Sequence, residues 1–247
     1  MTLTATRPSE LSPTTKARLA GALYLATILM GVFTQQYIAH LISPADAATT
    51  AANIAAHQSI FRLGFAVYLV ELACQIAMTL LFYDLLKPVS RTGSLLAATF
   101  SLVGCTIKIF SRLFFFAPLV ILGGAHYLSV FPADQLHALA LLSFKFQYYA
   151  ECIAMIFFGF SAIQRGYLVF RSTFLPRALG ILSAIGGLGW LTYLYEPLAV
   201  RLSPIIVSFA VVAGISTTLW LLFRGVDQQH WSQQAAASNQ RALAYDQ

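Results

Sequence analysis

Three charged residues, Glu71, Lys108 and Glu151, lie near the middle of three long apolar stretches. An ionised side chain at the centre of a lipid bilayer costs at least about 2.5 kcal/mol on insertion scales, so such groups face polar partners or water rather than lipid. Buried carboxylates in membrane proteins often exchange protons, and buried cations often hold anionic groups. These three positions therefore indicate the candidate site of the chain.

Further polar side chains lie near these three charged residues in the sequence, most of them four residues away, which is about one helical turn. The candidate intramembrane polar site has these members: Glu71, Gln75, Lys108, Arg112, Lys145, Gln147 and Glu151. In a binding protein or transporter, Lys108 and Arg112 would hold the anionic group of a small anionic or zwitterionic solute, and Glu71 or Glu151 would exchange a proton. No catalytic, cofactor-binding or metal-binding residue is predicted.

The same charges allow a second interpretation, because opposite charges inside a membrane often pair with each other. The chain would then be a structural or regulatory membrane protein whose ion pairs only lock three helices together. A third and weaker interpretation is a membrane-embedded enzyme that uses Glu151 as acid or base. The sequence has no nucleophile elbow, phosphate-binding glycine loop or nucleotide fingerprint, which argues against an enzyme.

The composition indicates a membrane protein, because 58% of residues are hydrophobic and only 10% are charged. Each membrane-spanning helix needs roughly 20 residues. Apolar runs of this length or more predict an all-α bundle of six transmembrane helices, at about residues 17–42, 60–86, 93–123, 139–163, 176–196 and 203–223. The predicted parts are an N-terminal segment (1–16), the membrane domain (17–224) and a polar, partly disordered tail (225–247).

Lysine and arginine residues predict the orientation in the membrane. Ten of them fall at the N-terminus, the second and fourth connections and the C-terminus: Arg7, Lys16, Arg18, Lys87, Arg91, Arg165, Arg171, Arg177, Arg224 and Arg241. Arg62 and Arg201 fall on the opposite side. Both termini are therefore predicted to be cytoplasmic. This topology and anionic lipid headgroups account for the net charge of +6 without a nucleic-acid partner.

The depths of the charges follow from residue counts along the predicted helices. A short connection at 87–92 joins the 60–86 and 93–123 runs, and Glu71 and Lys108 both lie roughly 22–24 Å from it. They are thus expected at the same level. Glu151 lies roughly 18 Å from the cytoplasmic end of the 139–163 run and is expected to join them.

The remaining motifs predict local structure and packing. The alanine-rich segment 43–59 is expected to form a short surface helix, and Trp231 in the tail is expected to touch the membrane interface. Small residues in the 176–196 and 203–223 runs predict close helix packing and, secondarily, a homo-oligomer interface. Cys74, Cys105 and Cys152 lack metal-site spacing, so small apolar packing is the expected role.

Four short motifs resemble one known family: Arg18–Gly21, Asn53–Arg62, Leu81–Val89 and Pro176–Gly180. They are similar to motifs of the bacterial membrane family described as domain of unknown function DUF4386. The likeness covers roughly residues 16–224. It implies a multi-pass protein of the bacterial cytoplasmic (inner) membrane, and it implies no catalytic residue, cofactor or substrate.

Overall fold

The computed structural model describes residues 11–245, and within this range the chain forms helices and no β-strand. Six of the helices described are long and apolar enough to cross a membrane, which confirms the predicted all-α bundle. They are α1 (Pro13–Tyr37), α3 (Gln58–Leu86), α4 (Arg91–Ile121), α5 (Ala133–Arg171), α6 (Arg177–Leu191) and α7 (Glu196–Phe223), of which α6 reaches spanning length together with the 3₁₀ turn that follows it, up to Leu194. Residues 1–10, with Arg7, lie outside the described residues.

Shorter elements connect or follow these spans. They are η1 (Ala39–Leu41) and α2 (Ala47–Ala56) between α1 and α3, η2 (His126–Leu128) before α5, η3 (Thr192–Leu194) between α6 and α7, and α8 (Gln228–Tyr245) after α7. Side-chain caps define several helix starts. The Ser12 hydroxyl accepts a hydrogen bond from the Thr15 amide at the start of α1, and Ser90 does the same for Gly93 at the start of α4.

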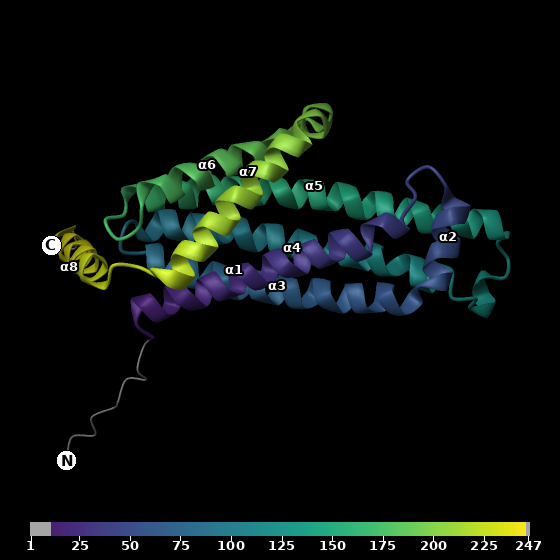
Figure 1. The fold of residues 1–247 in the computed structure, drawn as a ribbon, viewed down its shortest axis with the longest axis horizontal. Helices are drawn as coiled ribbons and strands as arrows, with labels where there is room; N and C mark the ends of the chain where they lie inside the picture. The colour runs from purple at the N-terminus through teal and green to yellow at the C-terminus, as the bar shows by residue number, and fades with distance from the viewer. Residues whose placement is uncertain (1–10, 246–247) are drawn as a thin grey trace, which may run out of the picture.

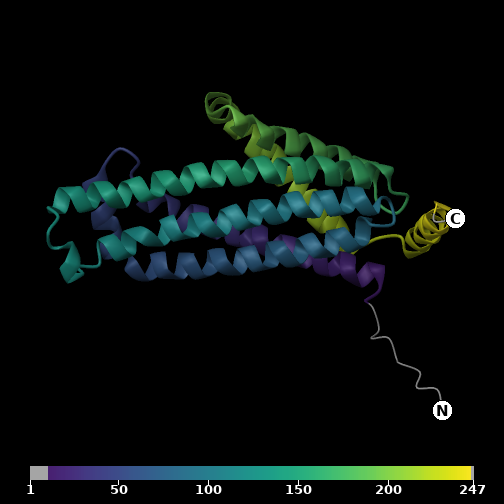
Figure 2. The same cartoon turned by 180° about the vertical axis from the view of Figure 1, so that it is seen from behind.

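The six spans form a ring in chain order. Each span packs on the next, from α1 through α3, α4, α5 and α6 to α7, and α7 closes the ring against α1. Figures 1 and 2 show α3, α4 and α5 running side by side, whereas α6 follows α5 and separates from it towards the α6–α7 turn, from which α7 crosses back diagonally towards the start of α1. The ring is therefore tightly packed around α3–α5 and looser between α1 and the α6–α7 hairpin.

The two ends of the bundle differ in character. We call the end where α1 begins and α7 ends the basic end, because Lys16, Lys87, Arg171 and Arg224 lie there (Figure 1). Asp84 accepts hydrogen bonds there from Lys16 Nζ at 2.7 Å and Lys87 Nζ at 2.9 Å, which joins α1 to the α3–α4 hairpin. We call the opposite end, which α2 covers, the cap end.

The fourth span is much longer than predicted. α5 has 39 residues and ends at Arg171, eight residues beyond the predicted end at 163. A helix satisfies its own backbone hydrogen bonds, so α5 continues past the apolar run without a change of structure. Glu151 therefore lies 20 residues, or about 30 Å, from the end of its helix rather than the roughly 18 Å that was predicted.

Glycines set the register between α5 and α6. A Cβ atom on Gly180 would lie 2.6 Å from the Gly166 carbonyl oxygen, and one on Gly187 would lie 2.7 Å from the Gly159 carbonyl oxygen. Only glycine permits this approach of two backbones. These small residues of the fifth span thus pack within the chain, and homo-oligomerisation stays a prediction.

α2 is the helix expected in the segment 43–59, and it crosses the cap end of the bundle (Figure 1). Thr50 and Ile54 are buried, and α2 packs mainly on α5. Asp46 caps its N-terminus, and hydrogen bonds from Thr49 lower the pKa of the Asp46 carboxyl below its ordinary value. The helix therefore buries one face rather than lying free on the surface.

The tail after Arg224 is helical over α8, in the segment for which composition favours partial disorder. Gly225, with φ of +67°, turns the chain between α7 and α8. Trp231 Nε1 then donates a hydrogen bond to the Leu85 carbonyl oxygen at 2.9 Å. This contact with the end of α3 docks α8 on the basic end, which a composition argument does not detect.

Candidate functional site

Glu71 on α3 and Lys108 on α4 form an ion pair inside the bundle. Lys108 Nζ donates to Glu71 Oε1 at 2.7 Å, and Glu71 is 6% exposed. The short α3–α4 connection fixes how the two helices align, so equal residue counts from the turn bring the side chains together. This confirms the predicted level of the two charges.

Glu151 on α5 pairs with Arg112, one turn further along α4 than Lys108. Arg112 Nη1 and Gln147 Nε2 both donate to Glu151 Oε1, the latter at 2.9 Å. The Arg112 guanidinium also lies 3.6 Å from the centre of the Tyr68 ring, and Arg112 is 1% exposed. The polar site is thus two adjacent ion pairs, one between α3 and α4 and one between α4 and α5.

The other two members of the predicted site lie apart from these pairs. Lys145 is exposed and forms no ion pair with any residue that the structure describes. Gln75 is half-buried, and its side chain makes no hydrogen bond within residues 11–245. The structure therefore brings together five of the seven predicted residues.

The surroundings of the ion pairs are apolar and well packed. Phe61, Phe115 and Phe144 form an aromatic cluster at the cap end, with ring centroids 5.6–6.2 Å apart. The Tyr68 ring packs edge-on against the Phe115 ring, and the Arg112 guanidinium lies over the face of the Tyr68 ring in a cation–π contact. Such low-dielectric surroundings strengthen the attraction within each pair and make an unpaired charge costly.

The two pairs lie at different depths. Lys108 and Arg112 are four residues apart on α4, so the two pairs are separated by about 6 Å along the bundle, and the Arg112–Glu151 pair is further from the basic end. In the contact between α5 and α6, Gly159 lies beside Gly187. Eight residues further towards the cap end along each segment, this alignment places Glu151 level with Tyr195 in the α6–α7 turn. Glu151 therefore lies at the level of the α6–α7 turn, towards the cap end of the bundle.

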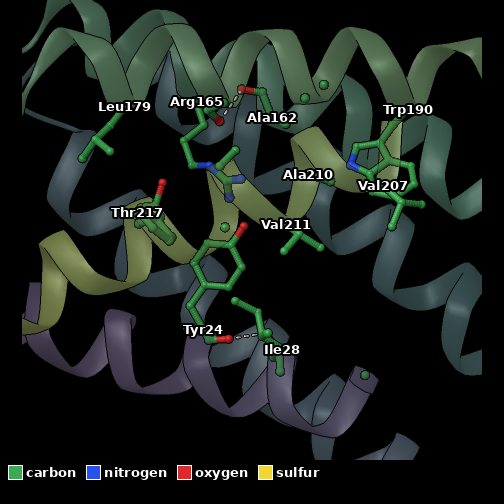
Figure 3. A pocket seen from close by; sticks show the side chains of 18 of the residues that line it. Tyr24, Ile28, Ala162, Arg165, Leu179, Trp190, Val207, Ala210, Val211 and Thr217 are labelled. Atoms are coloured by element: carbon green, nitrogen blue, oxygen red, sulfur yellow. Dashed lines mark hydrogen bonds between the residues drawn. The ribbon is translucent and has the colours of Figure 1, made fainter. Parts of the chain in front are cut away.

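A second feature lies on the looser side of the ring. A cavity of about 510 Å³ lies between α1, α5, α6 and α7. Figure 3 shows side chains from all four helices around it. At the basic end it is closed by Leu175, Leu179 and Leu221, which are buried in the core. Among its lining residues, Val32 on α1 and Val207 on α7 are about half exposed, so we place its mouth between these two helices.

Three polar groups extend into the same part of this cavity: Arg165 from α5, Tyr24 from α1 and Thr217 from α7 (Figure 3). No hydrogen bond or ion pair joins their side-chain polar groups to another residue in the range 11–245. The Arg165 guanidinium lies 5.0 Å from the centre of the Phe82 ring. The cavity thus holds a cation without a carboxylate partner among the described residues.

Sequence reasoning missed this group of residues. Arg165 was counted with the charges at the cytoplasmic helix ends, because the fourth span was predicted to end at 163. In the structure Arg165 lies six residues, or about 9 Å, inside the end of α5. The apolar residues that follow it, from Tyr167 to Phe170, are the signal that the helix continues.

The ring of six apolar helices with buried ion pairs defines a multi-pass helical membrane protein. A family model described as domain of unknown function (DUF4386) matches residues 19–225, so the chain belongs to that family. No curated protein and no solved structure matches the chain. Among the described residues, no three His, Cys, Asp or Glu side chains are grouped as metal ligands would be.

Proposed function

We propose that this protein binds an apolar or amphipathic molecule drawn from the bilayer, in the cavity between α1, α5, α6 and α7. The observation that carries the proposal is the cavity itself, which at about 510 Å³ falls in the range of small-molecule sites. Protein interiors otherwise contain few voids larger than a water molecule. A mouth between two membrane-spanning helices faces acyl chains, so a ligand enters from the lipid.

The ion pairs serve a different purpose in this proposal. Lys108 and Arg112 already have carboxylate partners, so neither offers a free charge to a solute. The pairs join α3 to α4 and α4 to α5. We propose that they lock these three helices into a rigid wall, against which the α6–α7 hairpin and α1 enclose the ligand.

The proposed orientation follows from the basic end. Lys16, Lys87, Arg171 and Arg224 stand at the helix ends there, and Figure 1 shows the start of α1 and α8 at the same end. The positive-inside rule then supports cytoplasmic termini. Membership of the family supports placement in a bacterial cytoplasmic membrane, as the sequence motifs imply.

Filling the cavity with Gly186→Leu is expected to weaken ligand binding at least about tenfold, because it removes room for two or three methylenes at about 0.8 kcal/mol each. A Cβ atom at Gly186 would meet no atom within 4 Å, so the backbone is not strained. The measurement is saturable quenching of Trp190 fluorescence by a brominated long-chain alcohol in neutral nanodiscs. Trp190 lines the cavity.

Two variants control this experiment. Gly186→Ala adds a single methyl group in open space and should bind nearly as the wild type does. Trp190→Phe should remove the saturable part of the quenching, because the other two tryptophans, Trp220 and Trp231, do not line the cavity. Absence of saturable quenching in the wild type, or equal binding by Gly186→Leu, would contradict a binding function for the cavity.

A second candidate function is binding or transport of a small anionic or zwitterionic solute with proton exchange at the polar site. One observation favours it: the Glu151 side chain is 30% exposed, although the side chain of its partner Arg112 is fully buried. Glu71→Gln should then abolish solute-driven proton flux in proteoliposomes without unfolding the protein. Unchanged flux in this variant, or no flux in the wild type, would leave the ion pairs with the locking role alone.

A further inference from the structure

We infer that the ligand of the cavity is a single-chain amphiphile with a compact anionic head, such as a fatty-acid carboxylate, and that Arg165 binds the head. This inference rests on the proposed binding function and specifies its ligand. The first reason is charge. An arginine inside a membrane protein is costly unless it is paired, and Arg165 has no carboxylate partner among residues 11–245.

The second reason is the chemistry around Arg165. A guanidinium binds a carboxylate through two parallel hydrogen bonds, and the Tyr24 and Thr217 hydroxyls can each donate another. All three side chains extend into the same part of the cavity (Figure 3). The Phe82 ring beside Arg165 offers only a cation–π contact, which leaves the hydrogen-bonding groups of the guanidinium available.

The third reason is the shape of the cavity. Leu175, Leu179 and Leu221 close it at the basic end, so a head at Arg165 has no direct exit to the nearby membrane surface. The head must pass sideways between α1 and α7, through a mouth lined by Val32 and Val207. This route suits a carboxylate and disfavours the large head of a two-chain phospholipid.

The arrangement also gives the ligand a direction. Because Gly166 lies beside Gly180, the antiparallel alignment of α5 and α6 places Arg165 level with Ile181. Trp190 lies nine residues further along α6, or about 14 Å towards the cap end. Most of the lining residues between these levels are apolar. The head therefore lies near the basic end, and the chain runs towards Trp190.

The test compares a brominated fatty acid with the matching alcohol, using Trp190 quenching in nanodiscs of phosphatidylcholine at a pH where the acid is ionised. The wild type should bind the acid about tenfold to a hundredfold more tightly than the alcohol. Arg165→Gln should remove this preference by weakening acid binding far more than alcohol binding, and an unchanged elution profile and circular dichroism spectrum would show that the variant is folded. Arg171→Gln is the matched control, because Arg171 lies on the same helix but is exposed outside the cavity.

The outcomes separate the two proposals. Equal binding of acid and alcohol by the wild type, or a preference that persists in Arg165→Gln, would overturn the inference while the cavity remains a binding site. Stronger saturable quenching by brominated phosphatidylglycerol than by the acid would also overturn it, in favour of a two-chain lipid. If neither alcohol, acid nor phospholipid quenches saturably, the binding function itself fails.

The position of the bromine tests the direction of the chain. Bromines in the outer half of the fatty acid should quench Trp190 more strongly than bromines near the carboxylate. The reverse order would place the head at Trp190 and overturn the role of Arg165.

Discussion

Glu71→Lys is expected to destabilise the bundle by about 3–5 kcal/mol, and Lys108→Glu in the same chain is expected to restore most of that loss. Removing one partner of a buried ion pair leaves an uncompensated charge in apolar surroundings, and here two cations would face each other as well. The exchanged pair can form again because the two side chains are in contact at 2.7 Å. The measurement is the free energy of unfolding in mixed detergent micelles.

The double-mutant cycle decides whether the pair locks the helices. The coupling between the two sites should exceed 0.5 kcal/mol, as found for residues in direct contact. Lys145→Glu is the control, because Lys145 is exposed and forms no ion pair with the described residues. It should change stability by less than about 0.5 kcal/mol. A double variant no more stable than Glu71→Lys would refute the lock.

Gly187→Ala is expected to destabilise the protein by about 3 kcal/mol, although it adds only one methyl group. The new Cβ would lie 2.7 Å from the Gly159 carbonyl oxygen and 2.9 Å from the Ile163 amide nitrogen. Both are backbone atoms of α5, so the two helices must separate to remove the overlap. Overpacking of this kind typically costs about 1–3 kcal/mol, and rigid backbone neighbours place this case at the upper end.

The adjacent residue provides a matched control for this effect. Gly186→Ala makes the same chemical change on the same helix, but its Cβ meets open space. It should be neutral or stabilise the helix by up to about 1 kcal/mol, because alanine favours the helix over glycine. Thermal unfolding in detergent should therefore give shifts of different size or sign. Equal shifts would mean that the α5–α6 contact is looser than described.

The local pattern of the sequence is enough to predict the six membrane-spanning helices and the ion pair between Glu71 and Lys108. The apolar runs predict six helices because each run is long enough to cross the hydrocarbon and is interrupted by turn residues. Glu71 and Lys108 meet as predicted because a short turn joins their helices, and counting residues from that turn gives their depth. Neither result requires knowledge of how distant helices pack.

The partner of Glu151 cannot be predicted in the same way, because α4 and α5 are joined by a longer connection that does not fix how the two helices align. Its depth depends on where α5 ends, and that end cannot be located from apolar residues alone once a helix extends past the membrane. The error of eight residues changes the distance of Glu151 from the end of its helix by about 12 Å. In the structure Glu151 still joins the polar cluster, where it pairs with Arg112, one turn from Lys108.

By itself, the sequence determined that this protein is a helical membrane bundle with an internal ion pair, because hydrophobic length and residue counts across a short turn are local quantities. Only the tertiary structure decided which glycines pack against a backbone, as Gly187 does, and which border a cavity, as Gly186 does. It also decided that Arg165 extends into that cavity. The physical reason is that cavities and close contacts depend on the tilt and register of helices distant in sequence, which the composition of each helix does not specify.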